Sequence, residues 1–482
     1  MLPISTLYEL IQSLTKTEKR YFKLETDQWG GSKSYRQLYD LLNGFSSLGE
    51  KEQDLLKHRF SFHQLEIARK HLSKVLLRTL DRYQRGKDYE TALWEKYTAA
   101  RILLRKGFSE AALKLVRQGK QAAQNNKQTH FFALLSELEL EIGVDQKFSD
   151  WTEEELIQVH TEIQQNEIQE EAQRKHASLY EIVLCRYWKN GVVRSQRQKA
   201  QLNDIMLEEH QIVMNHRQDT FTTQQLHLHF QSIYFRMTSD WENCLRSFHA
   251  LDELFQNNPA EWMAKPTQYI RFLQDVLETL RCFEAFEEMD YFLSRLESLQ
   301  QTNPPEKARV QLMMREHQLH RALAMGNFKT NTFDIPMISL QNDRVVRQDI
   351  IQWKFTLSRF HLSNKDFPTA LKLINELLQI PESVLGKINY TKIRILNMMI
   401  HQALDHRDYL VYEIRSFERK MKKAEGWHNT EKLVVDYLRQ WLAFKPWQNS
   451  DELLEQLLQN PYERVMVSEL GLKSWLMKNS SK

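Results

Sequence analysis

Two pairs of histidines have the spacing that comes closest to metal chemistry in this chain. His227 stands two residues before His229, and His317 stands three residues before His320. On a helix, the spacing of the second pair puts both rings on neighbouring positions, where they could hold a metal ion together with Glu316. Because 17 histidines make chance pairs common and no matching set of acidic ligands accompanies either pair, we predict no metal site and no cofactor.

Neither the cysteines nor the short catalytic motifs indicate an enzyme. Cys185, Cys244 and Cys282 lie far apart and form no C-x-x-C pair. This argues against a disulfide framework and a cysteine-built zinc site, and it fits a reducing compartment. The sequence has no G-x-x-x-x-G-K-[ST] phosphate loop, no H-E-x-x-H motif and no G-x-S-x-G motif. We therefore predict a protein without catalytic activity.

The composition favours a mostly helical chain. Glycine and proline number 13 and 10 among 482 residues, well below typical shares of about 7% and 5%, and turn-rich all-β folds need more of both. With 41% hydrophobic residues the chain can bury a core, but a single core stops growing near about 250–300 residues. The net charge of +3 creates no global field that would draw nucleic acid or a membrane.

The beginning of the sequence does not have the pattern of a targeting segment. The residues from Met1 to Leu14 are interrupted by Glu9 and Gln12 and lack the basic start and apolar run of a secretory signal. No stretch approaches the run of about 18 apolar residues that a membrane span needs. We therefore expect a cytoplasmic protein without a membrane partner.

A recurring break in the helical pattern divides most of the chain. Amphipathic segments are interrupted by a short polar turn that carries one aromatic or apolar residue, and then resume with helical spacing. These turn residues are about 42 residues apart on average: Phe108, Phe148, Val192, Trp241, Phe286, Phe328, Phe367, Tyr409 and Trp447. A period near about 40 residues with two helices in each unit is typical of an α-solenoid, so we predict that residues 89–482 form one.

Three of these units carry small residues where the two helices of a hairpin would cross. The residues are Ala99, Ser232 and Ser358 nine positions before the turn aromatic, Ala111, Cys244 and Ala370 three positions after it, and the apolar Leu115, Phe248 and Ile374 seven positions after it. In this pattern, and in the stretch Asn364–Leu371, the chain resembles the tetratricopeptide repeat family. The resemblance implies an all-α fold, a right-handed α-solenoid of helical hairpins with degenerate repeats.

Residues 1–88 do not follow the period, and we predict that they form a small N-terminal helical domain of about five helices. Thr15 and Glu18 have the spacing of a capping box at the start of one helix, and a long helix is predicted over residues 64–84. The segment Leu14–Leu24 resembles the opening of a group of bacterial helical-repeat proteins whose function is not known. That resemblance supports the helical architecture and implies no activity.

Two basic stripes run along helices predicted in this N-terminal domain. They are Lys16, Lys19, Arg20 and Lys23 on one helix, and Lys70, Lys74, Arg78, Arg82 and Arg85 on the long helix. Each stripe lies on one helix face, and such a face could dock on a phosphate backbone. The alternative is that both stripes are solvated faces balanced by acidic neighbours such as Glu18 and Asp81.

The tetratricopeptide resemblance also implies a binding groove. In that family the first helix of each unit lines a concave surface through residues 15, 12, 8, 5 and 4 positions before the turn aromatic. From the residues at these offsets we select twelve polar ones as the groove lining: His229, Arg236, Arg271, Gln274, Arg281, Glu316, His320, Gln352, Arg359, Arg394, Asn397 and His401. Most are arginine or histidine, and arginine pairs bidentately with carboxylates, so an acidic partner is expected.

Together these patterns predict a non-enzymatic scaffold or adaptor that binds a protein or peptide partner in the groove of a helical-repeat array. The alternative is a regulator whose N-terminal helical module binds DNA or RNA and whose repeat array senses a partner. Neither hypothesis involves a membrane or a small-molecule substrate.

Overall fold

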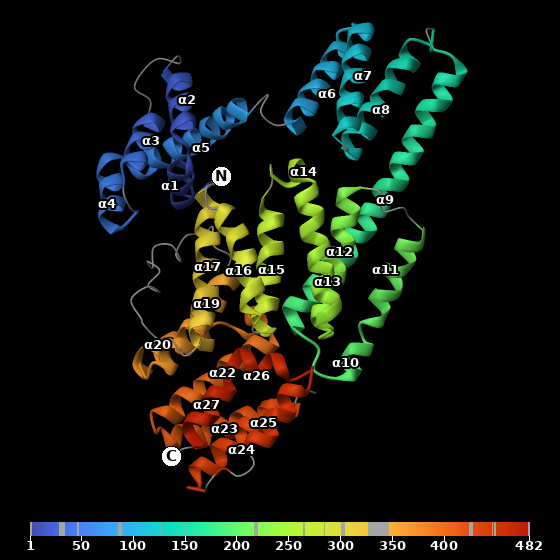
Figure 1. Cartoon of the computed structure of the whole chain (residues 1–482). Coiled ribbons are helices and arrows are strands. Elements are labelled where there is room, and N and C mark those ends of the chain that lie inside the picture. The colour runs from blue at the N-terminus through green and yellow to red at the C-terminus, as the bar shows by residue number, and fades with distance from the viewer. Residues whose placement is uncertain are drawn as a thin grey trace. The chain divides into compact units, whose positions relative to one another are not determined.

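A computed structural model describes the chain at residues 2–27, 34–45, 48–84, 89–126, 128–149, 151–215, 220–263, 266–283, 285–299, 304–325, 347–423, 428–445, 447 and 450–480. Within these ranges every regular element is a helix, as the composition predicts (Figure 1). The chain divides into two compact units, Met1–Glu171 and Ala172–Lys482. The boundary falls within the long helix α9 (Glu153–Asn190).

The first unit begins with five helices: α1 (Ile4–Ser13), α2 (Lys16–Asp27), α3 (Ser34–Gly44), α4 (Glu50–Arg59) and α5 (Phe62–Gln84). The predicted capping box starts α2. The backbone N–H of Thr15 donates to Glu18 Oε2 (2.7 Å), and the backbone N–H of Glu18 donates to Thr15 Oγ1 (3.2 Å). Phe22 of α2 and Tyr39 of α3 pack in the shared core with ring centroids 4.4 Å apart.

Three further helices and the first part of α9 complete this unit. α6 (Tyr89–Arg105), α7 (Ser109–Asn125) and α8 (Thr129–Asp145) pack on one another in sequence order. The buried carboxylate of Glu139 on α8 accepts hydrogen bonds from Lys120 Nζ (2.7 Å) and Arg117 Nε (2.9 Å) of α7. This ionic contact joins the two helices beside their apolar core.

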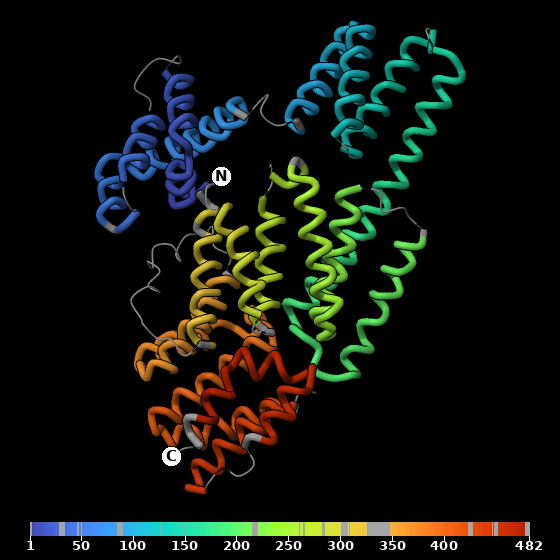
Figure 2. The backbone as a smooth tube through the Cα atoms, in the orientation of Figure 1, coloured from blue at the N-terminus to red at the C-terminus, as the bar shows by residue number. Residues whose placement is uncertain are grey.

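The second unit is a longer series of helices. After the last part of α9 come α10 (Gln196–Ala200), α11 (Asn203–Asn215), α12 (Phe221–Met237), α13 (Trp241–Asn257), α14 (Pro259–Met263), α15 (Thr267–Phe283), α16 (Phe286–Ser298), α17 (Pro304–Met325), α19 (Arg347–Ser363), α20 (Phe367–Leu378), α21 (Glu382–Leu385), α22 (Lys387–Ala403), α23 (Arg407–Lys423), α24 (Asn429–Leu442), α25 (Ser450–Gln459), α26 (Arg464–Leu470) and α27 (Leu472–Ser480). In Figure 2, α12, α13, α15 and α16 run side by side, and each packs on the next.

Four hairpins, α6–α7, α12–α13, α19–α20 and α22–α23, share one type of turn. A residue with left-handed φ follows the first helix, and the next N–H donates to a carbonyl five residues earlier, the 6→1 bond of a Schellman motif. The left-handed residues are Gly107 (φ 83°), Ser239 (57°), Lys365 (63°) and Asp405 (56°). The matching bonds run from Phe108 to Leu103, Asp240 to Phe235, Asp366 to His361 and His406 to His401. The hairpins therefore have the same local geometry at their turns.

Small residues lie where the helices of two hairpins cross, at the positions that the sequence predicts. Cys244 of α13 donates from Sγ to the carbonyl oxygen of Ser232 of α12 (3.3 Å). Ser358 of α19 donates from Oγ to the carbonyl oxygen of Ala370 of α20 (3.0 Å). All four residues are buried, so the two helices of each hairpin approach closely at these points.

In the hairpin α6–α7 the same prediction is wrong by one residue. Ala112 is buried and Ala111 is exposed. The reason lies at the turn, where Phe108 occupies the N-cap position that Asp240 and Asp366 hold before α13 and α20. The aromatic residue therefore marks a different helix position in this hairpin. The other two predicted positions are displaced by one residue as well: Ala100 is buried where Ala99 is predicted, and Val116 is buried where Leu115 is predicted.

Two predicted residues, Phe328 and Arg85, lie outside the described part of the chain, as does the side chain of Cys282. Among the helices that the structure describes, none is both long enough and apolar enough to cross a membrane.

Candidate functional site

Predicted groove residues of α12, α15 and α17 meet inside the second unit in one ionic cluster. Arg236 is buried and donates from Nη1 to Asp275 Oδ1 (3.2 Å) and from Nη2 to Glu278 Oε2 (2.5 Å). Arg281 donates from Nη1 to His320 Nε2 (2.9 Å). We call this cluster the interior charge network; its members are Arg236, Asp275, Glu278, Arg281, Glu316, His320, Lys392 and Glu469.

The short helix α26 adds a carboxylate to this network. Glu469 Oε2 lies 2.7 Å from Lys392 Nζ of α22, and Glu469 Oε1 lies 3.6 Å from Arg281 Nη2 of α15. α26 packs against both of these helices. Glu469 of the chain itself therefore pairs with Lys392 and Arg281, on the face where the sequence predicts that a partner's carboxylate would bind.

Burial shifts the ionisation of several of these groups. It raises the pKa of Glu316 to about 8 against the opposing charge of Arg281, and Gln352 hydrogen-bonds to this carboxyl group. Burial and Arg281 lower the pKa of His317 to about 3, and they lower the pKa of His320 well below its ordinary value. Because His320 Nε2 accepts a hydrogen bond from Arg281, the His320 ring is neutral.

Other predicted groove residues near the network are also held by intramolecular contacts. His229 is buried beside Tyr180, with ring centroids 5.5 Å apart, and burial together with Arg271 lowers the pKa of His229 to about 3. Arg271 itself hydrogen-bonds to Tyr180. Gln274 accepts a hydrogen bond from Arg309 Nη2 (3.1 Å).

The predicted residues of α22 lie on a different face, the one that packs against α23. Arg394 donates from Nε to Glu413 Oε1 (2.7 Å). Asn397 donates from Nδ2 to the hydroxyl of Tyr409 (2.9 Å), and the His401 ring stacks on Tyr409 with centroids 3.8 Å apart. These three residues therefore do not join the interior charge network.

The different face follows from where the second helix of this hairpin begins. α13 begins at Trp241, the aromatic residue from which its offsets are counted, whereas α23 begins at Arg407, two residues before Tyr409. Counted from Arg407, the offsets of 15 and 5 positions fall on Lys392 and Gln402. Lys392 belongs to the interior charge network, and Gln402 lines the cleft described next.

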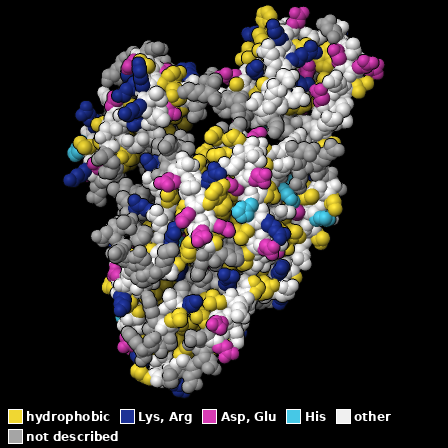
Figure 3. Space-filling model, viewed as in Figure 1, with side chains coloured by type: hydrophobic (Ala, Val, Ile, Leu, Met, Phe, Trp, Pro, Cys, Tyr) yellow, Lys and Arg dark blue, Asp and Glu magenta, His cyan; other side chains and the backbone are white. Residues whose placement is uncertain are grey.

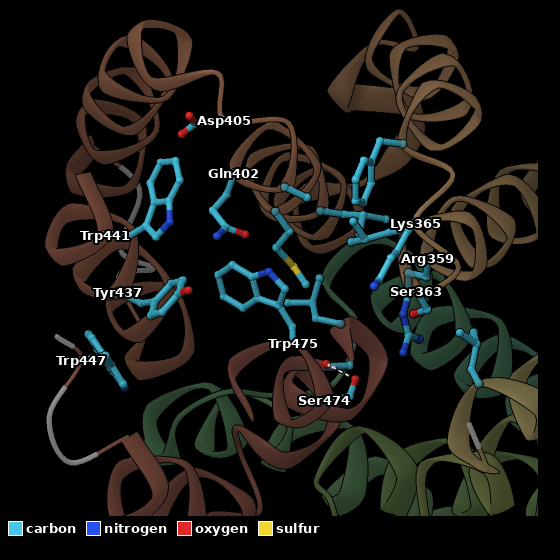
Figure 4. A pocket seen from close by; sticks show the side chains of 18 of the residues that line it. Arg359, Ser363, Lys365, Gln402, Asp405, Tyr437, Trp441, Trp447, Ser474 and Trp475 are labelled. Atoms are coloured by element: carbon cyan, nitrogen blue, oxygen red, sulfur yellow. Dashed lines mark hydrogen bonds between the residues drawn. The ribbon is translucent and has the colours of Figure 1, made fainter. Parts of the chain in front are cut away.

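A large cleft with a volume of about 1240 Å³ lies among α19, α22, α24 and α27. In Figure 4 the rings of Tyr437, Trp441 and Trp447 lie on one side of this space, Arg359 and Lys365 lie on the other, and Trp475 stands between them. We call it the tryptophan cleft; its polar and aromatic lining residues are Arg359, Ser363, Lys365, Phe367, Gln402, Asp405, Arg407, Tyr437, Trp441, Phe444, Lys445, Trp447, Ser474 and Trp475.

Cations outnumber carboxylates in the tryptophan cleft. Arg359, Lys365, Arg407 and Lys445 line it, and Asp405 is the one acidic residue among the described residues of its lining. Asp405 Oδ1 accepts a hydrogen bond from Arg407 Nε (2.8 Å). Among the residues that the structure describes, no carboxylate forms an ion pair with the other three cations. The cleft therefore has a local excess of positive charge.

Several polar groups of the cleft have unused bonding capacity. Burial and the charge of Arg281 lower the pKa of Arg359 to about 10, so nearby carboxylates compensate this guanidinium incompletely. The Gln402 side chain is 6% exposed, and its Oε1 atom has no hydrogen-bond partner among the described residues. The same holds for Nε1 of Trp447. Buried polar groups are normally paired, so these two atoms could bond to a ligand, but both are shielded from solvent and would do so only after a side-chain rotation.

Of the lining residues, the groove prediction includes Arg359 alone. Gln402 could have been found by counting from the start of α23 instead of from Tyr409. No sequence signal brings together Trp441, Trp447 and Trp475, because they come from three segments that meet in the folded unit.

The basic residues predicted on α2 and α5 lie at the surface of the first unit. Lys16, Arg20, Lys23, Lys70, Lys74, Arg78 and Arg82 are exposed, and Lys19 is half-buried. The two helices pack together, and Tyr83 of α5 donates to Thr17 Oγ1 of α2 (3.0 Å). Arg82 forms an ion pair with Glu25, which balances part of this charge. Figure 3 shows Lys and Arg side chains on the visible face of these N-terminal helices.

No protein-family model, no curated protein and no solved structure matches this chain. The features of this chain that could serve a function are the tryptophan cleft, the interior charge network and the basic faces of α2 and α5.

Proposed function

We propose that the protein binds an acidic peptide segment of a protein partner in the tryptophan cleft and catalyses no reaction. The observation that carries this proposal is the excess of cations in a cleft walled by tryptophans. Arg359 and Lys365 face the aromatic side chains across the cleft (Figure 4). An acidic side chain or a terminal carboxylate would compensate Arg359, and apolar side chains would cover Trp441 and Trp475.

The unpaired polar atoms favour a peptide over other acidic ligands. If the side chains of Gln402 and Trp447 rotate toward the cleft, a peptide N–H could donate to Gln402 Oε1 and a peptide C=O could accept from Trp447 Nε1. The volume of about 1240 Å³ also exceeds the range of about 300–1,000 Å³ that is typical of small-molecule sites. An extended segment of several residues would use this space better than a compact metabolite.

The same proposal includes the architecture that would present the cleft, a degenerate tetratricopeptide-like, right-handed solenoid. The common turn of the four hairpins supports it. So does the shared length of 17 residues of α6, α7, α12, α13, α19, α22 and α23. In such arrays each unit packs on its neighbours, and the surface of several units forms one binding site.

The proposal is tested by selecting displayed random peptides on the intact chain and measuring the affinity of labelled hits by fluorescence anisotropy. We expect the hits to be enriched in Asp and Glu, and we expect Arg359→Ala and Trp441→Ala each to weaken binding at least about tenfold, or about 1.4 kcal/mol. Arg246→Ala is the matched control, because Arg246 is exposed on α13 and pairs with Glu242.

Circular dichroism of each variant shows whether the fold is intact. Hits without an acidic bias, or wild-type affinity in both folded cleft variants, would rule out the tryptophan cleft as the site.

A second candidate function is nucleic-acid binding by the first unit. It is supported by the seven exposed basic residues on α2 and α5, two helices that pack together. It predicts that reversing Lys70, Lys74 and Arg78 to Glu abolishes binding of a DNA duplex, whereas reversing the exposed Lys106, Lys114 and Lys147 does not. Binding should also weaken steeply as salt is raised, because counterions are released from the phosphates. No binding at low salt would exclude this function.

A further inference from the structure

We propose that His176, Glu209 and His227 form a binding site for a divalent transition-metal ion of the zinc class. One nitrogen of each imidazole and one oxygen of the carboxylate all lie within 4.8 Å of one another. The three residues come from α9, α11 and α12, and all belong to the second unit. The inference is independent of the peptide-binding proposal, because none of the three lines the tryptophan cleft.

Each ligand lies on the face of its helix that packs inward. His176 precedes the buried Leu179 by three residues, Glu209 follows the buried Ile205 by four, and His227 precedes the buried Phe230 by three. Leu179, Ile205 and Phe230 belong to one hydrophobic cluster. The helical repeat therefore brings the three ligands to the same region of the second unit.

Burial makes this arrangement costly without a cation. The exposed fractions are 1% for His176 and 4% for Glu209, and the carboxylate of Glu209 contacts Nδ1 of His227. A buried carboxylate requires a compensating positive charge. Within the described residues no lysine or arginine forms an ion pair with Glu209. A divalent cation bound by all three side chains would supply that charge.

The donor set selects the metal class. Two imidazole nitrogens and one carboxylate oxygen suit zinc and its first-row neighbours, whereas calcium and magnesium prefer oxygen ligands. Tetrahedral zinc with bonds of about 2.0–2.2 Å keeps its ligand atoms about 3.3 Å apart. Small side-chain rotations would bring the three atoms to that separation, and water would take the fourth position. Such a site would fasten α11 to α9 and α12.

Histidine pairs read along one helix do not predict this site. His229, two residues from His227, points instead toward the rings of Tyr180 and Phe255. His227 finds its partners 18 and 51 residues earlier in the chain, on other helices. The metal ligands are therefore neighbours only in the folded unit.

The test uses the intact chain after treatment with a chelator. Titration with Co²⁺ should produce the visible d–d absorption of a four-coordinate site, one equivalent should suffice, and Zn²⁺ should displace it. Zn²⁺ but not Mg²⁺ should raise the temperature of thermal unfolding, because a ligand that binds the folded state stabilises it. X-ray absorption of the zinc-loaded wild type should show nitrogen and oxygen ligands with imidazole scattering and no sulfur.

Variants identify the residues. Glu209→Gln and His176→Gln should each weaken Co²⁺ binding at least about tenfold. His210→Gln is the matched control, because His210 is exposed and is the next residue on the same helix. If a ligand variant fails to fold, the Co²⁺ absorption and the X-ray absorption of the wild type still test whether the metal site exists. Sulfur ligation, loss of binding in His210→Gln, or equal binding in folded His176→Gln would each overturn the proposal.

Discussion

Lys392 Nζ donates to Glu469 Oε2 at 2.7 Å, a contact between residues 77 positions apart that joins α22 to α26. The other oxygen of Glu469 lies 3.6 Å from Arg281 Nη2. Two cations of the second unit thus find their carboxylate within the chain. In the tryptophan cleft, by contrast, Arg359 and Lys365 form no ion pair with a carboxylate of the described residues.

Replacing Glu469 with Gln should destabilise the second unit. Although burial raises the pKa of Glu469, Lys392 and Arg281 lower it below its ordinary value overall. A carboxyl with a lowered folded-state pKa stabilises the fold above its unfolded-state pKa, and this contribution is lost as the pH falls through the folded value. Removing the charge leaves the buried Lys392 without its carboxylate, at a cost of about 3 kcal/mol at neutral pH.

Urea unfolding followed by tryptophan fluorescence measures the effect of Glu469→Gln. Glu455→Gln, at an exposed position of α25, is the control and should unfold as the wild type does. Equal midpoints for Glu469→Gln and Glu455→Gln would show that α26 does not depend on this ion pair.

The crossing of α12 and α13 should not tolerate a larger side chain. Cys244 is fully buried, and its Sγ lies 3.3 Å from the Ser232 carbonyl oxygen. Cys244→Leu would force the helices apart, and overpacking of this kind costs about 1–3 kcal/mol. Differential scanning calorimetry should show a lower unfolding temperature for this variant. Cys185→Leu, at an exposed position of α9, should leave the temperature unchanged; an equal effect of the two substitutions would contradict the close crossing.

Glu316 should make stability fall as the pH rises from weakly acidic to weakly alkaline. Burial raises the pKa of Glu316 to about 8 in the folded state, from an ordinary value of 4.5 for an exposed glutamate. Between these values the folded state binds more protons than the unfolded state, so stability decreases with pH by up to about 1.4 kcal/mol per unit. Above the folded value the loss is complete.

The variant Glu316→Gln should lack this pH dependence, because an amide does not ionise. Urea unfolding at several pH values between about 5 and 8 compares it with the wild type and with Glu288→Gln, an exposed site on α16. If Glu316→Gln keeps the slope of the wild type, Glu316 is ionised in the folded protein and its neighbours compensate its charge.

Much of the helical architecture could be predicted from the sequence, because it depends on local signals. Low glycine and proline content indicates helices, and Asp240 and Asp366 cap the second helices of their hairpins at the predicted turns. Where the turn lacks this aspartate cap, the positions predicted by counting from the turn aromatic are wrong. Phe108 stands at the N-cap itself, and α23 begins two residues before Tyr409. An offset counted from an aromatic residue is reliable only when that residue holds the same helix position in every unit.

The sites depend on contacts that local signals do not encode. Glu469 reaches Lys392 because α26 returns to α22, and nothing in the sequence around α26 indicates that return. The tryptophan cleft likewise combines Arg359 with Trp441 and Trp475 from later helices. Periodic patterns describe which face of a helix is apolar, but the partner of that face is set by the packing of the whole unit.

Arg194 holds a buried triad whose loss should be more damaging than that of an exposed ion pair. Its Nη2 donates to Glu431 Oε2 (3.0 Å) and also to Glu463, and all three side chains are at most 7% exposed. Arg194→Met would leave two buried carboxylates without a cation, a cost of about 3–5 kcal/mol. The matched control is Arg186→Met, because Arg186 pairs with the exposed Asp204 and its loss should cost about 0–1 kcal/mol.

The pH dependence of the Arg194→Met effect separates charge from packing. Burial raises the pKa of Glu463, but Arg194 and Thr430 lower it below its ordinary value overall. The stabilisation by this pair is therefore present above the unfolded-state pKa of Glu463 and is lost as the pH falls through the lower folded value. The difference in unfolding free energy between wild type and Arg194→Met should accordingly shrink in acid.

Adding Glu431→Gln and Glu463→Gln to Arg194→Met should restore part of the lost stability at neutral pH, because no buried charge then remains unpaired. A difference that is constant with pH, and no recovery in the triple variant, would mean that Arg194 acts by filling space alone.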